Sequence, residues 1–224
     1  MPSVTDLTGP AGPLEALLDT PAGRTDGAVR AAVVFAHPHP QFGGTMHTKA
    51  VYQGTKGLVR LGCAVLRFNF RGVGRSAGQF DMGEGEKADF RAALDYMAAR
   101  YPGARLWAAG FSFGSWVALE VGADDDRVSA LIAVAPPVAT SVSGQVYTFE
   151  RSLVSTKPKF FVQGEADEVC PLEAMWAFYA KLEEPKDLVV IDMANHLFEG
   201  QAPEVGEALE DLLADFQPLA GTPA

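Results

Sequence analysis

The sequence predicts an α/β protein in which a mostly parallel, doubly wound sheet carries helices on both faces. Short apolar runs recur along the chain, and stretches with apolar residues at helical spacing separate them. The first ~25 residues are rich in proline and glycine, which is typical of an antiparallel hairpin at a sheet edge. The predicted parallel strands are residues 31–36, 63–70, 105–109, 130–135, 159–163 and 187–191.

Three stretches carry apolar residues at helical spacing, and we predict a helix for each. Within residues 84–100, Phe90, Leu94 and Met97 recur at this spacing. A second stripe follows residue 171, and a third lies near the end of the chain. We interpret all three stripes as core packing. The members of the second and third stripes are Leu172, Met175, Trp176 and Tyr179, and Val205, Ala208, Leu209, Leu212 and Phe216.

We expect residues 1–224 to form one domain, because the sequence has no repeats and no low-complexity linker. Residues 137–157 break the alternation of strands and helices. They show no helical period, and they are too few to form a domain of their own. We predict a short cap or an irregular excursion there. Its large apolar residues are Tyr147, Phe149, Leu153 and Val154.

Charge and composition exclude several classes of partner. The formal net charge is −10, and an acidic surface repels phosphate backbones and anionic lipids. We therefore expect no nucleic-acid partner and no membrane partner. The sequence begins without a secretory signal, has no apolar run of bilayer-spanning length, and contains only two cysteines, Cys63 and Cys170. These features predict a cytoplasmic protein with reduced thiols, and they leave the oligomeric state open.

The pentapeptide Gly-x-Ser-x-Gly occurs twice, around Ser112 and around Ser76. This pattern is typical of a catalytic serine on a tight turn between a strand and a helix, where side chains at the flanking positions would clash. Ser112 directly follows an apolar run and precedes a plausible helix at residues 115–120. Ser76 lies six residues after Phe70 and leads into loop sequence, so its glycines are better explained as turn residues. We predict Ser112 as the nucleophile.

A serine hydroxyl needs a base within hydrogen-bond distance and a third group that orients the base. In enzymes with this serine turn, the chain order is serine, then acid, then histidine. His196 is the only histidine after Ser112, and it follows the last predicted strand. We therefore predict His196 as the base.

The acid has several rivals. Asp167 comes four residues after the strand 159–163, and side chains at carboxyl ends of parallel strands reach the crevice where the serine turn lies. Glu165 and Glu168 flank Asp167, while Asp192 precedes His196 by only four residues, too close along the chain to orient the imidazole. We predict Asp167 as the acid.

Two backbone N–H groups are expected to bind the oxyanion. One is the N–H of Phe113, next to the nucleophile at the start of a helix. The other comes from the loop after the first parallel strand. Pro38 and Pro40 have no N–H, so His39 or Gln41 supplies it, and His39 is favoured by position.

A metal site and a carboxylate-binding site are alternative interpretations of two further groups of residues. His37, His39 and His47 lie close in sequence, but no carboxylate or cysteine is interleaved at ligand spacing, so we predict no metal. Arg71 and Arg75 are candidates for binding a substrate carboxylate, although a structural role in their loop is the favoured interpretation.

Six motifs together carry a family resemblance. They are residues 37–40 (HPHP), 42–46 (FGGTM), 68–76 (FNFRGVGRS), 110–114 (GFSFG), 164–167 (GEAD) and 195–196 (NH). On these motifs the chain resembles the small bacterial α/β-hydrolases that include serine carboxylesterases and relatives of dienelactone hydrolase. The resemblance implies an α/β-hydrolase fold and a Ser-His-Asp triad. Dienelactone hydrolases use a cysteine nucleophile, and the presence of Ser112 argues against that substrate.

The resulting hypothesis is a serine hydrolase that cleaves small or short-acyl carboxylic esters through an acyl-enzyme, without a cofactor. The short cap predicts an open pocket, with Phe42, Phe111, Phe113 and Tyr147 as wall candidates. A thioesterase or a small amidase would use the same triad. A hydrolase-fold protein that binds a ligand without turnover is the alternative from a different class.

Overall fold

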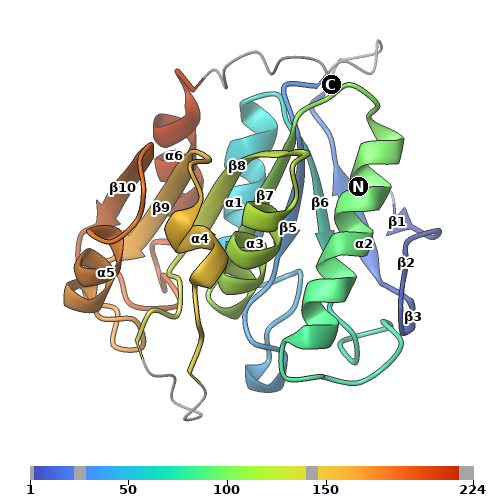
Figure 1. Ribbon diagram of the computed structural model, residues 1–224, viewed down its shortest axis with the longest axis horizontal. Coiled ribbons are helices and arrows are strands. Elements are labelled where there is room, and N and C mark those ends of the chain that lie inside the picture. The colour runs from blue at the N-terminus through green and yellow to red at the C-terminus, as the bar shows by residue number, and fades with distance from the viewer. Residues whose placement is uncertain (1–2, 23–28, 140–145, 217–224) are drawn as a thin grey trace.

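The computed structural model describes residues 3–22, 29–139 and 146–216, and a central sheet organises them (Figure 1). In the described ranges the sheet has eight strands in the order β1-β4-β6-β5-β7-β8-β9-β10, and β2 pairs with β3 in a separate two-stranded sheet. The strands of the large sheet are β1 (Ser3–Val4), β4 (Ala16–Asp19), β5 (Ala32–Ala36), β6 (Ala64–Phe68), β7 (Leu106–Phe111), β8 (Val128–Val134), β9 (Lys159–Gly164) and β10 (Lys186–Ile191); the small sheet consists of β2 (Thr8–Gly9) and β3 (Gly12–Pro13).

The direction of the strands confirms the predicted sheet. From β6 to β10 every neighbouring pair is parallel, whereas β1 and β4 add antiparallel strands at one edge. The predicted N-terminal hairpin is therefore present at the edge, although residues 1–2 and 23–28 of that region lie outside the described residues. All six predicted parallel strands are observed.

Helices cover both faces of the sheet. Figure 1 shows α1 (Lys49–Arg60) and α6 (Ala202–Leu213) behind it, and α2 (Glu84–Arg100), α3 (Phe113–Asp124), α4 (Glu150–Val154) and α5 (Leu172–Tyr179) in front. Side chains of β5 alternate between these layers: Val33 and Phe35 pack towards α1 and α6, and Val34 packs towards α2 and α3. Burial on both faces explains why the strands are apolar at nearly every position.

Two of the α-helices in the described ranges were not predicted. Helix α1 contains Gly54 and Gly57, which lower helix propensity and obscure its apolar stripe. These glycines instead permit close packing, because a Cβ on Gly57 would lie 2.2 Å from the carbonyl oxygen of Gly206 in α6. Helix α4 lies within the segment 137–157, of which residues 140–145 are outside the described residues; its five residues are too few to display a period.

A side chain from α3 determines where α4 begins. The Glu120 carboxylate accepts hydrogen bonds from the N–H groups of Arg151 and Ser152, both at 3.0 Å, and from the Ser152 hydroxyl at 2.8 Å. It therefore pairs the otherwise unsatisfied donors of the first turn. Trp116, four residues earlier on α3, donates to the Thr148 carbonyl. Residues 148–152 are thus anchored on α3. Within the described ranges, no helix has the length and apolar character needed to cross a membrane.

Replacing Gly57 by alanine is expected to destabilise the protein by about 1–3 kcal/mol, because the added methyl would overlap the Gly206 carbonyl and force α1 and α6 apart. Alanine is the better helix former by about 1 kcal/mol, so helix propensity alone predicts the opposite sign. Urea unfolding of both proteins measures the difference. A more stable variant would contradict the proposed close contact.

Candidate active site

Ser112 lies in the turn between β7 and α3 with a backbone that is rare for a non-glycine residue. Its φ is 51° and its ψ is −121°. Glycines on both sides permit the turn: a Cβ on Gly110 would lie 2.1 Å from the Gly114 carbonyl oxygen, and a Cβ on Gly114 would lie 2.4 Å from the His37 carbonyl oxygen. Both glycines of the sequence motif are therefore required by close backbone approach.

The three residues predicted as nucleophile, base and acid are joined by hydrogen bonds. His196 Nε2 lies 3.0 Å from Ser112 Oγ, and His196 Nδ1 lies 2.8 Å from Asp167 Oδ2. The residues follow the carboxyl ends of β7, β10 and β9, which meet at one edge of the parallel sheet. All three are buried. Their order along the hydrogen-bonded chain matches the sequence prediction.

The loops that carry the acid and the base are joined to each other. The N–H of Ala166 donates to the carbonyl of Ala194 at 3.0 Å. Gly164 permits this approach, because a Cβ there would lie 2.4 Å from the same carbonyl oxygen. Asp167 and His196 are therefore positioned by main-chain contacts, independently of their own hydrogen bond.

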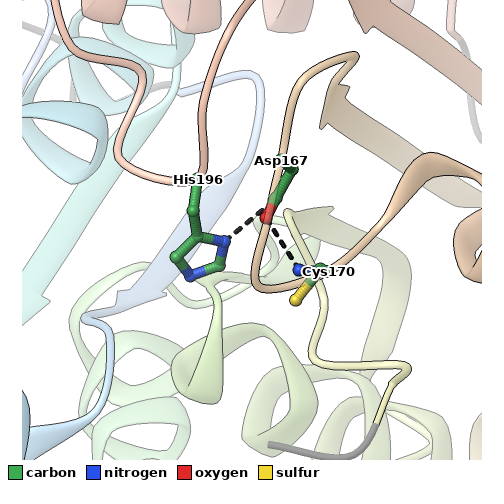
Figure 2. Close-up of side chains that lie close together, drawn as sticks. All are labelled: Asp167, Cys170 and His196. Atoms are coloured by element: carbon green, nitrogen blue, oxygen red, sulfur yellow. Dashed lines mark hydrogen bonds and ion pairs between the residues drawn. The ribbon is translucent and has the colours of Figure 1, made fainter. Parts of the chain in front are cut away.

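Asp167 accepts hydrogen bonds at both carboxylate oxygens. Oδ1 accepts from the N–H groups of Val169 at 2.9 Å and Cys170 at 2.7 Å, and Figure 2 shows Asp167 between His196 and Cys170. Oδ2 accepts from His196 and also from Gln163 Nε2, at 3.0 Å. Every partner is a donor, which suits an ionised carboxylate.

Gln163 is a site residue that the sequence reasoning missed. It is fully buried at the end of β9, and its Nε2 also donates to the Cys170 carbonyl at 2.7 Å. Its Oε1 has no hydrogen-bond partner, which is a cost that a buried amide rarely carries. The amide is therefore oriented so that its Nε2 group donates both hydrogen bonds, to Asp167 and to Cys170. A polar residue within an apolar strand, four residues before Asp167, was the available signal.

The rival acids lie elsewhere. Glu165, Glu168 and Asp192 are exposed, and Glu165 accepts a hydrogen bond from the N–H of Met193.

The predicted oxyanion donors lie on two adjacent loops. Phe113 is the first residue of α3, where an N–H has no acceptor within the helix. In the other loop, the Gln41 N–H donates to His39 Nδ1 at 3.2 Å, so the alternative donor considered from the sequence has a different partner. The N–H of His39 therefore remains the predicted second donor. The ring centroids of His39 and Phe113 lie 5.1 Å apart.

His37 fixes the loop that carries His39. Its Nδ1–H donates to the Pro38 carbonyl at 2.6 Å, and its Nε2 accepts from the Phe70 N–H at 3.0 Å. Burial lowers the pKa of His37 to about 4, so the ring stays neutral and keeps one donor and one acceptor. Both ring nitrogens are therefore engaged by backbone groups. The sequence places His37 in the motif at residues 37–40 and among the candidate metal ligands, but it does not indicate these hydrogen bonds.

Ser76, from the second Gly-x-Ser-x-Gly match, belongs to a set of hydrogen bonds that holds the loop after β5. Ser76 donates its hydroxyl proton to the Asn69 carbonyl at 2.6 Å and accepts from the Glu15 N–H at 2.9 Å. The Asn69 side chain accepts from the Met46 N–H, while Arg67 donates to the Met46 carbonyl. The Ser76 motif is thus structural, as its context predicted.

Arg71 and Arg75 do not reach the site. Arg71 forms an ion pair with the buried Asp89 at 2.8 Å, and Arg75 forms one with Glu15 at 3.0 Å. Neither arginine lines the cavity described next. The structural interpretation of both residues is supported.

A cavity of about 390 Å³ opens above Ser112. Phe42, Phe113 and Tyr147 line it, as predicted. Phe111 does not, and that prediction was wrong: its side chain is fully buried on the α6 face of the sheet, where its ring packs 5.4 Å from His196. The lining residues are Pro38, His39, Phe42, Gly43, Gly44, Thr48, Ser112, Phe113, Pro137, Ala139, Tyr147, Val169, His196 and Leu197.

One group of potential metal ligands occurs among the described residues. Ligand atoms of Asp167, Cys170 and His196 lie within 4.8 Å of one another. Asp167 Oδ2 and His196 Nδ1 already share a hydrogen bond, and burial followed by the nearby Asp167 charge raises the pKa of the Cys170 thiol. A protonated thiol is a poor ligand, so this arrangement suits a hydrogen-bonded pair better than a cation. Both cysteines are buried and free.

Comparison with known proteins identifies similar chains. The family described as "Serine aminopeptidase, S33" matches residues 27–156. An uncharacterized protein from Rickettsia prowazekii is 34% identical over 88% of this chain and 87% of its own length. An alpha-beta serine hydrolase homologue from Coxiella burnetii is 37% identical, with a TM-score of 0.83 over 94% of this chain and 96% of that one. XC6422 from Xanthomonas campestris, described as an a/b serine hydrolase without lid, is 35% identical, with a TM-score of 0.84 over 99% and 96%.

Replacing Gln163 by leucine is expected to lower kcat about 10-fold with little change in KM, because Asp167 loses one of its orienting donors. Removing a donor also concentrates negative charge on the carboxylate, so the acid limb of the pH profile of kcat/KM is expected to move. Steady-state kinetics with any cleaved substrate measures both effects. A variant with unchanged kcat and an unchanged profile would show that the amide only fills space.

Replacing His37 by glutamine is expected to change how stability depends on pH. Because the pKa of His37 is about 4 in the folded protein and about 6.5 when unfolded, the unfolded chain binds more protons between these values. The contribution of the neutral His37 ring to the free energy of unfolding is present in full above about pH 6.5, and it is lost as the pH falls towards about 4. The stability difference between wild type and variant should therefore narrow by about 3 kcal/mol from pH 7 to pH 4. Urea unfolding across this range measures it, and a constant difference would contradict the assignment.

Proposed function

Because this chain belongs to the α/β-hydrolase family described as serine aminopeptidase, S33, we propose that it hydrolyses carboxylic esters with Ser112, His196 and Asp167 as its catalytic residues. One observation carries the proposal. The hydroxyl of Ser112, at the base of the cavity, lies 3.0 Å from a histidine that is itself bonded to a buried carboxylate. This geometry suits removal of the hydroxyl proton during attack on a carbonyl.

In the first half-reaction, His196 Nε2 takes the proton of Ser112 as Oγ attacks the ester carbonyl carbon. Asp167 stabilises the imidazolium that forms, through the proton on Nδ1. The N–H groups of Phe113 and His39 bind the negative oxygen of the tetrahedral intermediate. The bond between the carbonyl carbon and the alcohol oxygen then breaks, and His196 returns its proton to the departing alcohol.

In the second half-reaction, His196 takes a proton from water, and the hydroxide attacks the acyl-enzyme. Collapse of the new intermediate releases the carboxylic acid and returns the proton to Ser112 Oγ. The cycle needs no cofactor, since every proton passes through one imidazole. A thioester or an amide enters the same sequence of steps with a different leaving group.

The described part of the predicted cap, residues 137–139 and 146–157, contributes Pro137, Ala139 and Tyr147 to the wall of the cavity. The related chain from Xanthomonas campestris is described as lacking a lid, and we infer the same arrangement for this protein. Tyr147, anchored near α3 by Trp116 with ring centroids 4.9 Å apart, forms one wall of the cavity. Small substrates enter such a cavity without a domain movement.

Treatment with a fluorophosphonate is expected to add one adduct to the wild type and none to Ser112→Ala, because only an activated serine reacts. Intact-protein mass spectrometry measures the adduct. Ester cleavage is expected to fall at least ~10⁴-fold in Ser112→Ala with the fold retained.

Ser76→Ala is the matched control, since it alters the serine of the second motif and should still be labelled. If the adduct were absent from Ser76→Ala and present on Ser112→Ala, the assignment of the nucleophile would be reversed. A folded wild type that never reacts would favour a binding protein without turnover.

A further inference from the structure

Among the described residues, the lining of the cavity above Ser112 includes no aspartate, glutamate, lysine or arginine that could neutralise a charged substrate. The ionisable residues in this lining are His39, His196 and Tyr147, and its hydroxyl groups belong to Thr48, Ser112 and Tyr147. Burial raises the pKa of Tyr147 to about 12, so that residue stays uncharged. Desolvating an ammonium or a carboxylate group here would cost far more than desolvating a methyl group.

The mouth of the cavity exposes large apolar side chains. Phe42 is 66% exposed and Leu197 is 50% exposed, and both also line the cavity. Phe42 ends the short helix Pro40–Phe42 in the loop after β5, whereas Leu197 directly follows His196 in the loop after β10. Exposed apolar area beside a pocket is typical of a surface that a ligand covers.

The walls between the mouth and Ser112 continue this character. The rings of His39 and Phe42 lie 4.8 Å apart, and Phe113 packs 6.0 Å from Tyr147. An apolar chain bound to Ser112 would therefore contact aromatic and aliphatic groups from the reacting carbonyl to the surface. A short acetyl group would leave the outer part of this surface exposed to water.

We propose that the substrate is an uncharged ester whose apolar chain fills the cavity and extends between Phe42 and Leu197. This inference rests on the proposed function, and it specifies the substrate class of the same site. It also separates this chain from the activity named in its family's description, because a peptide with a free amino terminus brings a cation that no acidic lining residue in the described part of the chain would bind.

The first test compares three ethyl esters of similar length: hexanoate, 6-aminohexanoate and the monoester of adipate. We expect kcat/KM for both charged esters to be at least ~100-fold lower than for ethyl hexanoate at neutral pH. Titration of the released acid measures all three rates. Equal or faster cleavage of either charged ester would overturn the inference.

The fluorophosphonate adduct separates this inference from the proposed function. If Ser112 is labelled but ethyl hexanoate is not cleaved faster than the charged esters, the substrate class is wrong and the catalytic assignment survives. If Ser112 is not labelled and no ester is cleaved, the proposed function itself fails, and this inference fails with it.

The second test uses variants at the mouth, Phe42→Ala and Leu197→Ala. We expect each to lower the ratio of kcat/KM for hexanoate over acetate about 10-fold, because the longer chain loses its outer contacts. The acetate rate is the internal control for folding and for the catalytic residues. Phe42→Leu keeps an apolar side chain and should retain most of the ratio.

Val154→Ala is the matched control, because Val154 is 73% exposed and apolar but does not line the cavity. Its ratio should equal that of the wild type. An unchanged ratio in both Phe42→Ala and Leu197→Ala would overturn the role of the mouth, as would an equal fall in Val154→Ala.

Discussion

The strained turn at Ser112 is the constraint on which the rest of the site depends. A non-glycine residue at φ 51° and ψ −121° costs about 1–3 kcal/mol and persists only where its surroundings enforce it. Here β7 lies in the middle of the parallel sheet between β5 and β8, and the Ser112 N–H donates to the Val134 carbonyl at 2.8 Å. Buried neighbours on both sides hold the turn in place, so the hydroxyl points into the cavity instead of relaxing into the helix.

The same turn determines where the neighbouring loops lie. Gly114 has no side chain, so the His37 carbonyl approaches the start of α3, and the loop after β5 rests against the N-terminus of that helix. His37 then links this loop to Phe70 after β6. The acid and base loops are joined in the same way through Gly164 and Ala194. Backbone contacts at Gly114 and Gly164, together with the His37 side chain, therefore place the four loops, and the loops position Ser112, Asp167 and His196.

This organisation explains how far the sequence predicted the molecule. The parallel strands and the chain order of Ser112, Asp167 and His196 are local signals, and the comparisons confirm the resemblance and the α/β-hydrolase fold drawn from them. Helix α1 was missed because its glycines serve tertiary packing at the expense of propensity. Phe111 was misplaced because the sequence does not tell which face a residue meets where a strand turns into a helix. Gln163 was missed because it lies within an apolar strand just before the motif at residues 164–167, and its hydrogen bonds to Asp167 and Cys170 form only in the folded chain.

The apolar wall of the cavity and the hydrogen-bonded residues Ser112, His196 and Asp167 lie in the same buried environment. In the proposed mechanism, excluding water would strengthen the hydrogen bonds from the N–H groups of Phe113 and His39 to a developing oxyanion, and it would strengthen the attraction between Asp167 and a protonated His196. In that mechanism the negative charge of the oxyanion arises only during the reaction, next to the proposed donors. A charge carried by the substrate itself would meet no such donors along the walls, and it would lose its hydration on entry. The environment that favours charge at one atom therefore disfavours it elsewhere, so the proposed catalysis and the proposed selectivity for uncharged esters have the same physical origin.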